Sequence, residues 1–169
     1  MSDLQLNRDL DMIERMEKDL TDKVVEAFSS EGVEGGIYGV FSLDHLEGLT
    51  EQDLCRKIAV GVQYTGVELY SGVKAPLNTA PGGNSAVTLD LKFLIVLGVP
   101  TGPDCQERFS ATKLLTLLRR DILGSTVSGD RTNRTWAFVK EAPNVDVSSD
   151  TMLYYSQAWR VSVVSNQPY

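Results

Sequence analysis

A run of strict alternation constrains the fold of this chain more than any other feature. Between residues 87 and 99 every second position is apolar, and the intervening positions begin with Thr88, Asp90 and Lys92. A period of two is typical of a β-strand with one buried face. A strand this long is expected at the centre of a sheet. From Leu94 and Val96 onward the second face is apolar too, so we expect a helix, a neighbouring subunit or a folded-back arm to cover both sides of that end.

Further segments with strand character can join the same sheet. Residues 57–64 alternate cleanly and predict a half-buried strand, and residues 37–43 are a weaker strand candidate because of their glycine. Residues 134–140 place Trp136 and Phe138 on one face. Residues 153–165 predict the last strand, with a buried face made of Leu153, Tyr155, Trp159, Val161 and Val163.

Two segments have the three-to-four spacing of amphipathic helices. The first covers residues 6–28, with its apolar stripe at Leu6, Leu10, Ile13, Met16, Leu20, Val24 and Phe28. The second is expected from Asp104, which forms a capping box with Glu107, to about Leu123, with Gly124 ending it. Its predicted buried stripe is Phe109, Leu114, Leu115, Leu118 and Ile122.

These elements predict one α+β domain over residues 1–169, with a mostly antiparallel sheet of four to five strands and both helices packed on one face. The other face is semi-polar and would meet water in a monomer, or neighbours or a lumen in a ring. Residues 66–86 contain Pro76 and Pro81 and are long for a loop. They are either an arm that leaves the domain body or an ordinary insertion.

Charge is distributed unevenly along the chain. The sequence has 16 Lys+Arg against 23 Asp+Glu, a net charge of −7. Residues 1–34 hold ten acidic and four basic side chains, whereas the rest of the chain is almost neutral. This balance argues against a dedicated nucleic-acid binder. The exposed side of the first helix, with Asp11, Glu14, Glu17 and Asp22, is therefore a candidate contact or DNA-repelling surface.

Four arginines near the second helix are candidate contacts of the opposite sign. Arg119 and Arg120 lie in its last turn, and Arg131 and Arg134 follow across a polar loop. Cations there complement the helix dipole, and they could also contact an acidic partner surface such as the first helix of a neighbouring copy. Lys74, in the long loop, is a further candidate contact.

Residues that could support catalysis are few. His45 is the sole histidine and the two cysteines, Cys55 and Cys105, are not paired as C-x-x-C, so reduced thiols and no metal site are expected. The Gly98–Asp104 turn lacks a phosphate-binding motif. We therefore expect no enzyme activity and no cofactor. A Cys–His pair remains the alternative that would make the chain an enzyme. No apolar run approaches the roughly 20 residues that span a bilayer, and residues 1–8 include no apolar targeting segment, so a cytosolic protein is expected.

The whole arrangement resembles the tail terminator proteins of long-tailed bacteriophages, in particular the Mu-like family with contractile tails. The likeness covers roughly residues 10–165 and is one of element order. It is carried by the acidic N-terminal helix, the strand at 57–66, the long loop, the strand at 91–99, the helix at 111–120 and the closing strand at 154–161.

The resemblance implies a structural virion protein. Such a protein forms a hexameric ring on the last ring of tail-tube subunits, stops tube polymerisation and joins the tail to the neck. Expected partners are further copies of the chain, the tail-tube protein, and the sheath and neck or head-completion proteins. The expected location is the neck end of the virion tail, after assembly in the host cytoplasm. Alternatives are another neck, stopper or tail-completion protein, or a small α+β enzyme or ligand-binding domain.

Overall fold

Strand β3, Thr88–Pro100, lies in the middle of a five-stranded sheet, as its alternation predicts. The computed structural model describes residues 3–31, 37–41, 58–69, 88–100, 110–143 and 152–164. The element order is α1 (Asp3–Ser30), β1 (Ile37–Phe41), β2 (Ile58–Leu69), β3, α4 (Ala111–Ile122), β4 (Ala137–Pro143) and β5 (Met152–Val164). The strand order across the sheet is β1-β2-β3-β5-β4.

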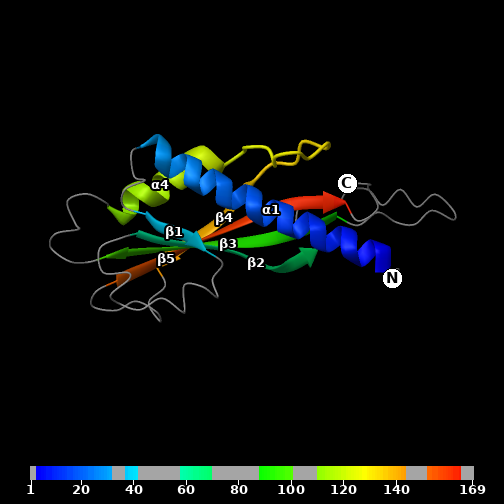
Figure 1. Ribbon diagram of the computed structural model, residues 1–169, viewed down its shortest axis with the longest axis horizontal. Helices are drawn as coiled ribbons and strands as arrows, with labels where there is room; N and C mark the ends of the chain where they lie inside the picture. The colour runs from blue at the N-terminus through cyan, green and yellow to red at the C-terminus, as the bar shows by residue number, and fades with distance from the viewer. Residues whose placement is uncertain are drawn as a thin grey trace.

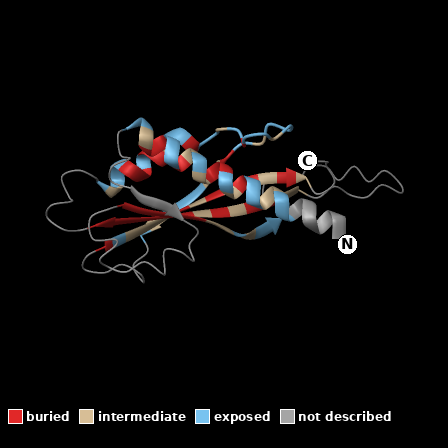
Figure 2. Ribbon diagram, in the orientation of Figure 1, coloured by how far each residue is buried: buried red, intermediate tan, exposed pale blue. Residues whose placement is uncertain are grey.

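Four of the strands, β2 to β5, pair antiparallel, and β1 joins the edge of β2 in the parallel sense. Both helices lie on the same side of the sheet (Figure 1). Figure 2 shows each helix turning buried residues toward the sheet and exposed ones away from it. The predicted fold class, α+β with a mostly antiparallel sheet and two helices on one face, is confirmed.

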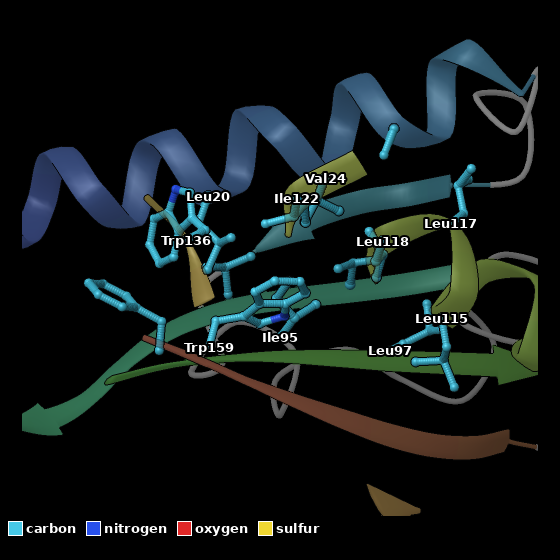
Figure 3. Close-up of a cluster of buried hydrophobic side chains, with 14 of the residues drawn as sticks. Leu20, Val24, Ile95, Leu97, Leu115, Leu117, Leu118, Ile122, Trp136 and Trp159 are labelled. Carbon is cyan, nitrogen blue, oxygen red and sulfur yellow. The ribbon is translucent and has the colours of Figure 1, made fainter. Parts of the chain in front are cut away.

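The core fills the space between the helices and the sheet. Leu20 and Val24 of α1 meet Leu118 and Ile122 of α4 above Ile95 and Trp159 of the sheet (Figure 3). Aromatic rings pack edge to face at its centre, with Phe93 5.1 Å from Trp136 and 5.5 Å from Tyr64 between ring centroids. Full burial of a large apolar side chain contributes about 1.5–3 kcal/mol, and both helices bury several such side chains against the sheet.

The end of β2 and the start of α4 differ from the predicted boundaries. Strand β2 continues to Leu69, four residues into the predicted loop, through an irregularity between Tyr64 and Gly66 where Gly66 has a φ of 130°. Helix α4 begins at Ala111, because Ser110 is extended, with φ −70° and ψ 126°. The predicted cap, Asp104 with Glu107, lies outside the described residues, as does Phe109. Gly124 follows the helix with a φ of 76°, which confirms the predicted end.

At its start, β5 buries the face opposite to the one predicted. Met152 is buried and Leu153 is 42% exposed. The reason is a second apolar cluster, away from the helices, in which Met152 packs with Ala59 and Tyr154. Tyr154 lies so close over Gly98 that a Cβ there would come within 2.7 Å of its ring. Val96 on this face is also buried, which confirms that this end of the sheet is covered on both sides.

Candidate functional site

The outer face of α1 bears the acidic residues that the sequence singles out. Asp11, Glu14 and Asp22 are exposed, and Figure 2 shows that the exposed residues of this helix face away from the sheet. Asp22 is paired with Lys18 at 2.7 Å, one turn earlier. Exposed pairs of this kind contribute only a few tenths of a kcal/mol. The face is therefore a solvated surface whose charge is available to a partner.

Glu17 has a different role from its neighbours. Its carboxylate accepts a hydrogen bond of 3.0 Å from the backbone N–H of Tyr64 in β2. Strand β1 pairs with β2 only as far as Gly61, so this N–H lies on a stretch of the strand edge beyond β1. Glu17 thus serves the fold, and the predicted acidic contact face reduces to Asp11, Glu14 and Asp22.

The two arginines of the last turn of α4 bind acidic groups of their own chain. Arg120 contacts Glu31, just after α1, at 3.2 Å, and Asp121 at 2.6 Å. Its hydrogen bonds to Asp121 and then to Glu31 raise the pKa of the guanidinium further above its ordinary value. Arg119 lies 3.6 Å from Glu141 and above the Phe138 ring. Both side chains remain partly exposed. They can therefore still contact a partner, although their charges are already paired within the chain.

Arg131 and Arg134 belong to a hairpin, residues 124–136, that joins α4 to β4 and projects from the body (Figure 1). Arg134 is buried against Asp130, with the guanidinium 3.1 Å from the carboxylate. Arg131 is exposed at the tip, and no acidic side chain among the described residues pairs with it. Of this pair, the structure leaves Arg131 as the accessible contact.

A buried carboxylate that sequence reasoning missed connects the hairpin to α1. Asp19 accepts hydrogen bonds from the Trp136 indole N–H at 2.8 Å and from the Ser128 backbone N–H at 3.2 Å, and Lys23 lies 3.7 Å away. The position of Asp19 in the sequence is the one feature that could have indicated its burial. Asp19 directly precedes Leu20 and follows Met16 by three residues, at the border of the apolar stripe rather than on the polar face.

The second face of the sheet holds another ionic group that the sequence did not reveal. Asp90 is almost fully buried and accepts hydrogen bonds from Arg160 at 2.7 Å and Ser162 at 2.6 Å. Lys92 next to it pairs with Glu68. These side chains come from β2, β3 and β5, which brings them together only once the strands are in register.

The remaining predicted candidates, Lys74, His45, Cys55 and Cys105, lie outside the described residues. In the part of the chain that is described, no three His, Cys, Asp or Glu side chains form a group that could hold a metal ion. Neither described helix combines the length and apolarity needed to cross a bilayer.

No protein-family model matches the sequence, and no curated protein matches it.

Proposed function

We propose that this chain is a tail terminator of a contractile-tailed bacteriophage. Six copies form a ring on the last ring of the tail tube, stop its polymerisation and present a surface to the neck. The observation that carries the proposal is the order of elements: an acidic helix, strands β1 and β2, a long connection, the central strand β3, helix α4 and the closing pair β4 and β5. This is the order on which the resemblance to the Mu-like family rests.

The distribution of charge supports an assembly role. Among the described residues, Asp11, Glu14 and Glu26 of α1 have no cation partner. Every described acidic side chain outside α1, Glu31 included, lies beside a Lys or an Arg. The excess negative charge of the described body is thus concentrated on one exposed helix face. Such a face can contact a basic partner, and it repels DNA that passes through a ring.

Electron microscopy of assembled particles tests the proposal. Gold-labelled antibody against this chain should mark the neck end of the tail, at the last tube ring. Label at the head-proximal connector, away from the tube, would favour the alternative of a neck or stopper protein. Label throughout the tail would contradict both.

A small α+β enzyme is the alternative from a different class, and it depends on His45 with Cys55 or Cys105. The test is the triple variant His45→Ala, Cys55→Ala, Cys105→Ala. Under our proposal this variant assembles like the unmodified chain. Loss of a measured activity or ligand affinity in the variant, with the fold intact by circular dichroism, would favour the enzyme.

A further inference from the structure

Among the described residues, α1 and the hairpin each present exposed charges that pair with no side chain of opposite sign, and the acids of α1 are opposite in sign to the base of the hairpin. On α1 the carboxylates of Asp11 and Glu14 face solvent. On the hairpin the guanidinium of Arg131 does the same. Neither side pairs with an oppositely charged side chain among the described residues of its own chain. Each therefore offers a charge that a contact between two molecules can neutralise.

The hairpin that presents Arg131 has a defined shape. Val127 donates its N–H to the Arg134 carbonyl at 2.8 Å, and Trp136 and Gly124 pair across its base. Below the tip, the Asp130 carboxylate accepts hydrogen bonds from the backbone N–H groups of Thr132 and Arg134 and from the Thr132 hydroxyl. The side chains of Asp130 and Arg134 are each only 8% exposed.

The base of the same hairpin is fixed to the body. Val127 and Trp136 are buried in the core, and Asp19 binds both the Trp136 indole and the Ser128 backbone. The tip, in contrast, is exposed from Ser128 through Asn133 apart from Asp130 (Figure 2). These contacts hold the backbone of the hairpin that carries Arg131, which lowers the entropy of ordering the backbone that binding would otherwise cost.

We propose that the 124–136 hairpin is a docking element whose Arg131 binds the acidic face of α1, at Asp11 and Glu14, on a second copy of this chain. Charge complementarity selects this occupant. Among the described residues, the acids without a cation partner all lie on α1, and Arg131 pairs with none of them within its own chain, so a second copy can supply this acidic surface. The inference rests on the proposed function, because this contact would join neighbouring copies in the ring.

Charge reversal with rescue tests the contact. The association of the full-length chain is measured by sedimentation velocity at low salt for Arg131→Glu, for the pair Asp11→Lys with Glu14→Lys, and for all three changes together. Either reversal should weaken association about tenfold or more, because like charges then oppose each other across the contact. The combined variant should recover most of the association.

Lys113→Glu is the matched control, since Lys113 is an exposed base on α4 that pairs with no described acidic side chain and undergoes the same change of charge. It should associate like the unmodified chain. Unchanged association of Arg131→Glu, an equal loss in Lys113→Glu, or no recovery in the combined variant would each overturn the inference.

The proposed function and the hairpin contact can be refuted independently of each other. If the unmodified chain forms no ring, the tail-terminator proposal fails. If Arg131→Glu forms the same ring and still caps tubes, the proposed function stands and the hairpin contact is wrong. Circular dichroism and Trp136 fluorescence of each variant distinguish a lost contact from a lost fold.

Discussion

At the scale of single residues, two buried carboxylates hold parts of the chain that are far apart in sequence. Asp19 joins α1 to the hairpin, and Asp90 joins β3 to β5. A buried charge is tolerated only when hydrogen bonds and a counter-charge compensate for lost hydration. Each of these carboxylates has both, so removing either side of the contact leaves the other uncompensated.

Replacing Asp19 tests the first of these contacts. Asp19→Ala should lower the free energy of unfolding by about 3 kcal/mol, because the Trp136 indole and the Ser128 N–H are left buried without acceptors. Urea unfolding followed by circular dichroism measures the loss. Asp22→Ala, on the exposed side of the same helix, should change stability by less than about 0.5 kcal/mol. Similar values for the two variants would contradict the role given to Asp19.

A double-mutant cycle tests the second contact. Arg160→Met should lower the free energy of unfolding by about 2–3 kcal/mol, because the Asp90 carboxylate then stays buried with the Ser162 hydroxyl as its remaining donor among the described side chains. Adding Asp90→Val should recover part of that loss, since the uncompensated charge is removed. Additive costs in the double variant would show that the two side chains act independently.

At the scale of elements, periodicity predicted most of what the structure contains. The positions of α1, β3 and β5 follow directly from their apolar spacing, because burial against one layer imposes that period. The start of α4 and the end of β2 were misplaced. A capping box and a glycine indicate where a chain can turn, but pairing with other strands determines where a strand ends. Strand β2 continues through Gly66 because β3 provides hydrogen-bonding partners for it up to the Leu69–Leu89 pair.

The candidate surface was predicted less completely than the elements. The acidic stripe is visible in the sequence, but the sequence does not show which charges are used internally. Glu17 binds Tyr64, and Arg134 binds Asp130. The first contact depends on how the elements pack, and the second on the conformation of the hairpin. Asp90 likewise looks like one more polar position of an alternating strand until β5 places Arg160 beside it.

The hairpin is the element whose stability should depend on pH. Burial by itself raises the pKa of Asp130, but hydrogen bonds from Arg134 and Thr132 outweigh it, so the pKa is lowered from its ordinary 3.8. A lowered pKa in the folded state stabilises the fold above the unfolded value, and that contribution is lost as the pH falls through the folded value.

Comparison with Asp130→Asn isolates this contribution. At pH 7 the unmodified chain should be more stable than the variant by about 1–2 kcal/mol, and the difference should shrink as the pH falls below about 4. Urea unfolding at pH 7, 5 and 3 measures it. A difference that stays constant over this range would contradict the account of the hairpin.

At the scale of the whole molecule, the net charge of −7 divides into an almost neutral sheet-and-helix body and an acidic helix attached to it. The helix buries one side in the core and exposes the other. Glu17 and Asp19 hold the fold, whereas the exposed acids are the ones that, under the proposed function, serve assembly or repel DNA. Changing Asp11, Glu14 and Asp22 together to Lys should leave the unfolding free energy within about 1 kcal/mol. Assembly, measured by native mass spectrometry, should be strongly reduced. Unchanged assembly would leave this face with a role in solubility alone.

Growth of tail tubes measures the central claim most directly. A tail-tube protein of a contractile-tailed phage is allowed to polymerise with increasing amounts of the purified chain, and tube lengths are read from negative-stain images. We expect substoichiometric amounts to shorten the tubes, with a six-fold ring at one end of each. Tubes of unchanged length with bare ends, alongside a chain that remains monomeric, would contradict the account.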